Sequence, residues 1–149
     1  MGNLKGKRAF ITGASQGIGA AIAEGMIEAG ADVVLHYFNS DATPRALAER
    51  AKAKGQRALV LQANLMDEAG ASNVVKEAVE FLGGLDVLIN NAGSLVARRK
   101  LEEVDLAFWD EVIKINMTSM MCVTRAARPA LVAGGSSSIV NVASLAGRK

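Results

Sequence analysis

Short apolar runs alternate along this chain with longer segments in which apolar residues recur every three or four positions. A short continuous apolar run is typical of a strand covered on both faces, and the wider spacing is typical of a helix with one buried face. The first run, residues 8–12, is followed by a segment of helical spacing that extends to Ala29. The same alternation continues along the sequence, which predicts a β-α-β-α order and a parallel sheet.

The expected elements are bounded by turn and capping residues. The predicted strands cover residues 8–12, 32–36, 58–62, 85–90 and 138–143, and the predicted helices cover residues 17–29, 44–54, 68–82 and 106–131. We expect Thr43 to cap the second helix, with Pro44 at its first position, and Asp67 to cap the third. A glycine follows each of the first three helices, where a left-handed residue commonly ends a helix. These elements predict an α/β protein with a Rossmann-like, doubly wound parallel sheet of five strands.

The segment Thr12–Gly19 connects the first predicted strand to the first predicted helix. Glycine has no Cβ, so the backbone turns sharply and a ligand can approach it, while a helix start offers free N–H groups and a positive dipole end. We expect Gly13 to permit the turn, Gly17 to admit a pyrophosphate and Gly19 to pack the helix on the strand. The GxxxGxG spacing differs from the better-known GxGxxG, and a plain strand-to-helix turn is the alternative.

Three further polar features follow later in the chain. Asn90-Asn91-Ala92-Gly93 ends the fourth predicted strand and Ser144 follows the fifth, so both lie where ligands bind in open α/β sheets. Asn116 lies within an apolar part of the long predicted helix. A buried amide must find hydrogen-bond partners, so Asn116 is either a structural group or part of a site.

Composition narrows the classes of function. The net charge is only +2 over 149 residues, and no basic block is present, which argues against a nucleic-acid partner. No apolar stretch approaches the ~20 residues of a membrane-spanning helix. Cys122 is the only cysteine, which excludes an internal disulfide and disfavours a thiolate metal site; we expect a buried thiol in a cytoplasmic protein without a metal. The basic loop 94–100 is either a solvated loop or a contact for an anionic substrate or carrier protein.

Taken together, Thr12–Gly19, Asn90–Gly93, the helix around Asn116 and Ile139–Ser144 resemble the short-chain dehydrogenase/reductase family. Within it the chain looks most like the 3-oxoacyl-carrier-protein reductases and the sugar or polyol dehydrogenases. The resemblance covers essentially the whole chain and implies one NAD(P)-binding domain over residues 1–149. It also implies hydride transfer between nicotinamide and a small carbonyl or alcohol substrate, in a homo-oligomer, either a tetramer or a dimer. By this resemblance Ser144 bonds the substrate oxygen and Asn116 holds a water of a proton relay.

The resemblance also assigns cofactor contacts. They are Gly13, Ser15, Gln16, Gly17, Ile18, Gly19, Tyr37, Asn39, Ser40, Asn64, Leu65, Asn91, Ala92 and Gly93. An NAD site places a carboxylate at the end of the second strand, and this chain has none there. Asn39, Ser40 and Arg45 suit a 2′-phosphate, which favours NADP. Gln16 stands where many NADP-binding members carry Arg or Lys, so NAD is the alternative. His36, the only histidine, is interpreted as a strand-end residue rather than a catalytic base.

One part of the family pattern is missing. The family's Tyr-x-x-x-Lys motif lies about a dozen residues beyond the serine, whereas this sequence ends at Lys149, with Leu145 four residues before it. The only tyrosine, Tyr37, falls on the adenine side. We therefore expect the 149 residues to be part of a longer natural enzyme, with an edge strand at 138–143 and apolar positions Ile115, Met120, Met121 and Val123 short of cover.

Two functional hypotheses remain, with a third that fits poorly. The first is an oxidoreductase that is complete only with further chain. The second is a non-catalytic NAD(P)-binding module or inactive fragment, which the missing tyrosine and lysine favour. A methyltransferase also carries a glycine loop after its first strand, but it does not explain Asn90–Gly93 or Ser144.

Overall fold

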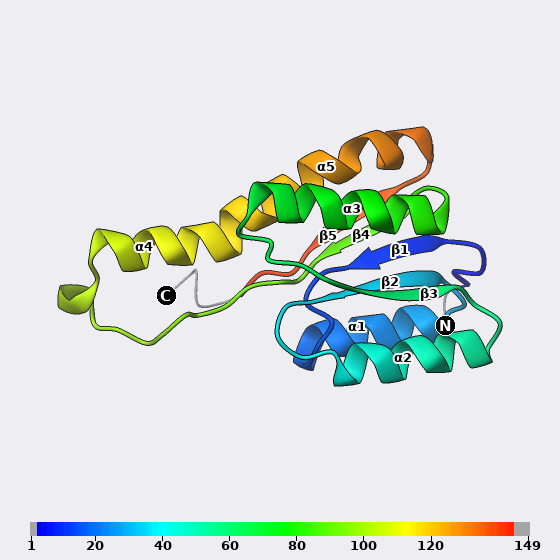
Figure 1. Ribbon diagram of the computed structural model, residues 1–149, viewed down its shortest axis with the longest axis horizontal. Helices are drawn as coiled ribbons and strands as arrows, with labels where there is room; N and C mark the ends of the chain where they lie inside the picture. The colour runs from blue at the N-terminus through cyan, green and yellow to red at the C-terminus, as the bar shows by residue number, and fades with distance from the viewer. Residues whose placement is uncertain (1–2, 145–149) are drawn as a thin grey trace.

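The computed structural model describes residues 3–144 as a parallel sheet between two layers of helices (Figure 1). The strands are β1 (Arg8–Ile11), β2 (Asp32–Tyr37), β3 (Ala58–Gln62), β4 (Val87–Asn90) and β5 (Ser138–Asn141), in the order β3-β2-β1-β4-β5. The chain moves outward from β1 to β3 and then returns to place β4 on the other side of β1. The carboxyl ends of β1 and β4 therefore form the switch point at which such sheets bind ligands. The predicted five-stranded, doubly wound α/β fold is confirmed.

The helices divide between the two faces of the sheet (Figure 1). Helices α1 (Gly17–Glu28) and α2 (Ala42–Ala53) cover one face, and α3 (Glu68–Leu82) and α5 (Ser119–Ala133) cover the other. Helix α4 (Leu106–Ile113) extends beyond the carboxyl ends of the strands, after a short 3-10 turn η1 (Leu101–Glu103). None of the helices in the described part of the chain is long and apolar enough to cross a membrane.

Alternation along the strands produces two cores. Phe10, Val34 and Leu88 lie side by side in the core under α3 and α5. Their neighbours in sequence, such as Ile11 and Leu35, enter the core under α1 and α2. Successive side chains of a strand point to opposite faces, so a strand buried on both faces must be apolar throughout. This explains why the sequence shows continuous apolar runs.

Two helix boundaries illustrate where capping predictions hold and where they fail. Asp67 caps α3 as predicted, because its carboxylate accepts the Gly70 N–H at 3.0 Å. The prediction for α2 is wrong: the helix begins at Ala42 with Asp41 before it, so Thr43 and Pro44 lie inside the first turn. Proline is tolerated there because first-turn N–H groups have no partner within the helix.

Several strands are shorter than predicted. β1 ends at Ile11, β4 begins at Val87, and β5 ends at Asn141. Leu85 illustrates the reason, since it is fully buried although it precedes the paired part of β4. An apolar run reports burial, and burial extends beyond the residues that pair in the ladder.

The long predicted helix 106–131 contains an interruption. Between α4 and α5, residues Lys114–Thr118 form a π-helical segment, η2, and the helical path then continues to Ala133. The periodicity of apolar residues in the sequence does not reveal a single π-helical turn, because the extra residue shifts the apolar face of the helix by only one position. Such turns are frequent at functional sites.

The expected lack of cover is confirmed for part of this region. β5 is an edge strand of the described sheet, with Ile139 44% and Val140 46% exposed, and Met121 is 48% exposed. The expectation was wrong for Val123, which is 1% exposed because it packs in the core between α5 and α3. Cys122 is buried, as predicted.

Candidate functional site

The glycine turn between β1 and α1 is tightly packed on one side and open on the other. A Cβ on Gly19 would lie 2.1 Å from the Gly13 carbonyl oxygen, and one on Gly13 would lie 2.9 Å from the Ala92 Cα. Gly17 has a positive φ of 54°, yet a Cβ there would meet nothing within 4 Å. Gly13 and Gly19 are therefore required by packing, whereas Gly17 borders open space.

The open side of this turn is the start of α1. Gln16 precedes the helix in an extended conformation and makes no side-chain cap, and the first turn carries no acidic residue. The first N–H groups of a helix lack intrahelical acceptors, and the helix dipole makes this end positive. The arrangement suits a phosphate of a dinucleotide.

Asn91 and Thr12 tie the end of β4 to this turn. The Asn91 amide nitrogen donates to the carbonyls of Thr12 (3.1 Å) and Gly13 (2.9 Å). In return, the Thr12 hydroxyl accepts the N–H groups of Asn91 (3.0 Å) and Ala92 (3.1 Å). The side chain of Asn91 thus fixes the backbone of the glycine turn. Thr12 was not among the predicted contacts, although its position beside Gly13 at a strand end was a usable signal.

His36 holds the same turn from the other side. Its Nδ1 accepts the Gly13 N–H at 3.1 Å, and its Nε2 lies 3.1 Å from the Ala63 carbonyl, to which it donates. These partners require the neutral ring with its proton on Nε2. Burial lowers the pKa of His36, and the Ala63 hydrogen bond opposes that effect. The sequence interpretation placed His36 at a strand end but missed its link to the glycine turn.

The predicted adenine-side contacts lie on exposed loops that follow β2 and β3. Tyr37 is half-buried, while Asn39, Ser40 and Asn64 are exposed. The Ser15 hydroxyl donates to the Ser40 carbonyl at 2.8 Å, which joins the glycine turn to the loop after β2.

Two residues on this side differ from the simplest expectation. Leu65 is buried in the core under α3. Arg45 donates to Asp41 at 2.5 Å, and this hydrogen bond raises the pKa of Arg45 and lowers that of Asp41. The cation proposed for a 2′-phosphate is therefore held by a carboxylate in this structure.

Asn116 lies in the π-helical segment and closes on the loop after β4. Its Oδ1 accepts the Ser94 N–H at 3.0 Å, and its Nδ2 donates to the carbonyls of Ser94 (2.8 Å) and Val112 (2.9 Å). A Cβ on Gly93 would lie 2.7 Å from Asn116 Oδ1. The side chain thus satisfies its hydrogen bonds with backbone groups and fixes the loop beside the predicted site.

Ser144 lies three residues beyond β5 and is exposed. The Val142 N–H donates to the Asn90 carbonyl at 2.9 Å, so the chain still follows β4 just before Ser144. Leu145 and Lys149, the positions compared with the family's Tyr-x-x-x-Lys motif, lie outside the described residues. Within residues 3–144, no group of three or more His, Cys, Asp or Glu side chains is placed to hold a metal ion.

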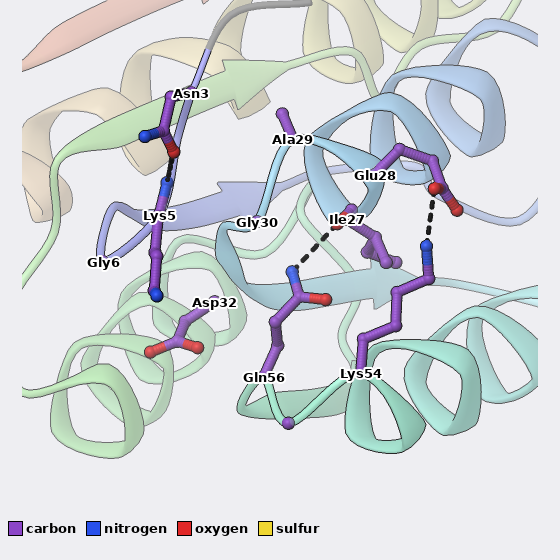
Figure 2. A pocket seen from close by; sticks show the side chains of 11 residues that line it. Asn3, Lys5, Gly6, Ile27, Glu28, Ala29, Gly30, Asp32, Lys54 and Gln56 are labelled. Carbon is purple, nitrogen blue, oxygen red and sulfur yellow. Dashed lines mark hydrogen bonds and ion pairs between the residues drawn. The ribbon is translucent and has the colours of Figure 1, made fainter.

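A hollow of about 490 Å³ lies at the opposite end of the sheet, where the strands begin (Figure 2). Several of its lining groups bond within the protein: Lys54 to Glu28 at 2.5 Å, the Gln56 amide to the Ile27 carbonyl at 3.0 Å, and Asp32 to Arg57 at 2.8 Å. It adjoins the starts of the strands, whereas open α/β sheets bind ligands at the strand ends. The glycine turn is therefore the better candidate despite its open shape.

Comparison with known proteins agrees with this geometry. The model of the short chain dehydrogenase family matches residues 7–149. This chain belongs to that family. It is 37% identical over 145 residues to a 3-oxoacyl-(acyl-carrier-protein) reductase of Staphylococcus aureus, an alignment that covers 95% of this chain and 57% of the relative. The chain thus spans little more than half the length of the curated relatives it matches.

Two solved structures of similar fold contain a nicotinamide cofactor. A short chain dehydrogenase from Burkholderia cenocepacia, in complex with NADP, is 37% identical with a TM-score of 0.82; the match covers 87% of this chain and 52% of that one. Carveol dehydrogenase from Mycobacterium avium, in complex with NAD, is 30% identical with a TM-score of 0.90; the match covers 100% and 58%. Solved relatives therefore include both NADP and NAD complexes.

Proposed function

We propose that this chain is the cofactor-binding part of an oxidoreductase that transfers a hydride between NAD(P) and a carbonyl or alcohol substrate. The observation that carries the proposal is the glycine turn, closed against Ala92 at Gly13 and open at Gly17 beside the start of α1. Family membership supports the same chemistry. We regard residues 1–149 as one NAD(P)-binding domain of the protein.

In this proposal the start of α1 and the residues around the glycine turn have different roles. The start of α1 binds the pyrophosphate, while Asn91, Thr12 and His36 hold the turn that presents it. The bound nicotinamide supplies or accepts the hydride. Fixed N–H groups need no reorganisation when an anion arrives, so a rigid turn favours binding.

At the substrate end, Asn116 fixes Ser94 and thereby the loop beside Gly93. We assign Ser144 the hydrogen bond to the substrate oxygen and Asn116 the support of a water in the proton relay. Because the side chain of Asn116 is engaged with Ser94 and Val112, its backbone carbonyl is the group that we assign to that water. The only tyrosine, Tyr37, ends β2 on the far side of the glycine turn, so we assign it no proton transfer.

We propose NADP as the preferred cofactor, with NAD as the alternative. No carboxylate follows β2 until Asp41, and Asp41 bonds Arg45. Arg45, Asn39 and Ser40 are then available for a 2′-phosphate once the Arg45 guanidinium turns from Asp41. Charge-assisted bonds from Arg to phosphate are stronger than neutral ones.

Calorimetric titration of the 149-residue chain with NADP⁺ and NAD⁺ tests the proposal. We expect saturable binding at one site per chain and a lower Kd for NADP⁺. No binding of either cofactor would overturn the cofactor assignment. Equal affinities would overturn only the preference.

A non-catalytic module is the second candidate, favoured by the position of the only tyrosine. Oxidation of NADPH with a panel of ketones and acetoacetyl thioesters separates the two. Turnover well above background by this chain would exclude the module. A homo-oligomer, either a tetramer or a dimer, and a cytoplasmic location stay predictions.

A further inference from the structure

His36 connects three segments of the candidate site. It lies in β2, its Nδ1 accepts the Gly13 N–H at 3.1 Å, and its Nε2–H donates to the Ala63 carbonyl at 3.1 Å. Gly13 opens the phosphate turn, and Ala63 precedes the predicted adenine contacts Asn64 and Leu65. One buried ring, 2% exposed, therefore spans the two halves of the proposed dinucleotide cradle.

We propose that His36 is a positioning residue of the cofactor site, and that its protonation and cofactor binding oppose each other. The inference rests on the proposed function, because it requires that the glycine turn binds the dinucleotide. The neutral ring holds the turn in the conformation described here. The protonated ring cannot hold it, for the following reasons.

A proton added to His36 goes to Nδ1, the acceptor of the Gly13 N–H. Two donors then face each other, and the Gly13 N–H loses its partner. A buried donor without an acceptor loses its hydrogen bonds to water without replacing them, which destabilises this arrangement. The turn gains by moving Gly13 away from the ring, and this movement displaces the start of α1, where the phosphate would bind.

The surroundings offer the charged ring no compensating partner. Burial is the main cause that lowers the pKa of His36, with no carboxylate among the causes. On the neighbouring strands, Arg8 lies at the opposite end of β1, bonded to Asp86, and β3 has no titratable residue. The titratable groups at the near ends of the packed helices and loops are Tyr37, Asp41, Arg45, Asp67, Glu68 and Arg125, all outside the core.

These groups are also engaged elsewhere. Asp67 caps α3, Glu68 pairs with Arg125, and Asp41 pairs with Arg45. On α1, Glu24 pairs with Arg50 of α2, and Glu28 pairs with Lys54, the residue after α2. No described carboxylate is therefore placed to stabilise the imidazolium, and its formation must be relieved by movement of the turn.

The experiment uses the fact that His36 is the only histidine in the chain. Its imidazole C–H signal in a ¹H–¹³C NMR spectrum is unambiguous. We would titrate this signal with pH in the free 149-residue chain and in the presence of saturating NAD⁺, which carries no titrating phosphate monoester. We expect the pKa to be lower with NAD⁺ than without it, and NAD⁺ affinity to fall on acidification by the matching factor, because linkage is reciprocal.

His36→Asn is the matched variant, because its amide oxygen can accept the Gly13 N–H but does not titrate. We expect it still to bind NAD⁺ at pH 7.5, more weakly than wild type because the bond to the Ala63 carbonyl is lost, and to lose the acid-dependent fall in affinity. His36→Phe fills the space without an acceptor, and we expect at least tenfold weaker binding at both pH values. A merely structural role would not remove the pH dependence in one variant and retain binding.

The outcomes separate this inference from the proposed function. Failure of wild type to bind NAD⁺ or NADP⁺ at pH 7.5 would contradict the proposed function itself. Binding with the same His36 pKa in the free and bound chain would overturn the role of His36 and leave the function intact. An acid-dependent fall in affinity that persists in His36→Asn would overturn it as well. If the variants do not fold, the wild-type titration alone decides.

Discussion

The side-chain amide of Asn116 forms two hydrogen bonds with the backbone of Ser94: it accepts the N–H at 3.0 Å and donates to the carbonyl at 2.8 Å. A side-chain amide here takes the place that a neighbouring strand would take in a ladder. Asn116 lies in the π-helical segment η2, and its amide contacts the loop that follows β4. It fixes the loop that borders the proposed substrate position.

Removing these hydrogen bonds should increase the mobility of the loop after β4 and destabilise the folded chain. Asn116→Ala removes three hydrogen bonds and leaves the Ser94 backbone to water, so we expect a loss of about 1–3 kcal/mol in the free energy of unfolding. Hydrogen exchange should accelerate in residues 94–100 and stay unchanged in α3. Urea denaturation and exchange mass spectrometry measure the two effects. Unchanged protection in the loop would contradict the role assigned to Asn116.

The three glycines of α1 should respond differently to alanine. Gly19→Ala places a Cβ 2.1 Å from the Gly13 carbonyl oxygen, so we expect loss of the turn and of cofactor binding. Gly17→Ala meets open space at a φ of 54°, so we expect about 1–2 kcal/mol of strain and at least tenfold weaker cofactor binding.

Gly25→Ala is the matched control for both variants. Gly25 lies on the exposed side of α1, where a Cβ meets nothing within 4 Å, so we expect about 0.5–1 kcal/mol of added stability and unchanged binding. Thermal melts and calorimetric titrations measure these effects. Equal losses of binding in all three variants would show that helix composition, rather than the turn, decides affinity.

The ion pair between Arg8 and Asp86 should make stability depend on pH. The Arg8 guanidinium donates to Asp86 at 2.8 Å and lowers the pKa of that carboxyl group below its usual range. A carboxylate whose pKa is lower folded than unfolded stabilises the fold above its unfolded pKa, and this contribution is lost as pH falls through the lowered value. We therefore expect stability to fall below about pH 4, the region of an ordinary Asp pKa.

Asp86→Asn tests this relationship. The variant should be about 1.5–3 kcal/mol less stable than wild type at pH 7, because a charged hydrogen bond is lost, and the difference should shrink at pH 3. Glu49→Gln is the control, since Glu49 pairs with Lys52 on an exposed face and should change stability by less than about 1 kcal/mol. A difference that is the same at both pH values would contradict the ion-pair account.

Arg45 should contribute to the choice of cofactor. It is an exposed residue near the start of α2, and its present partner is Asp41. We expect Arg45→Ala to weaken NADP⁺ binding about tenfold more than NAD⁺ binding, because only NADP⁺ carries the 2′-phosphate. Arg50 lies farther along α2 and pairs with Glu24 of α1. Arg50→Ala should leave the ratio of the two Kd values unchanged. A ratio that Arg45→Ala does not change would place the 2′-phosphate elsewhere.

Local sequence was sufficient for the order of elements and for the glycine turn. Apolar runs identified the inner strands β1, β2 and β4, because strands covered on both faces cannot carry exposed polar positions. Asp67 identified the start of α3 because a cap acts on N–H groups within three residues of itself. The prominence of Gly13, Asn91 and Asn116 likewise followed from their residue types and positions in the chain.

Tertiary structure alone decided how these residues act on one another. The links from Asn91 to Gly13 and from His36 to Gly13 join residues 78 and 23 positions apart, so they exist only because the sheet places β4 and β2 on either side of β1. The π-turn at Asn116 and the burial of Val123 also depend on packing against the sheet and α3. A periodic pattern records which face is apolar, whereas a hydrogen bond between strand ends depends on the order in which the strands assemble.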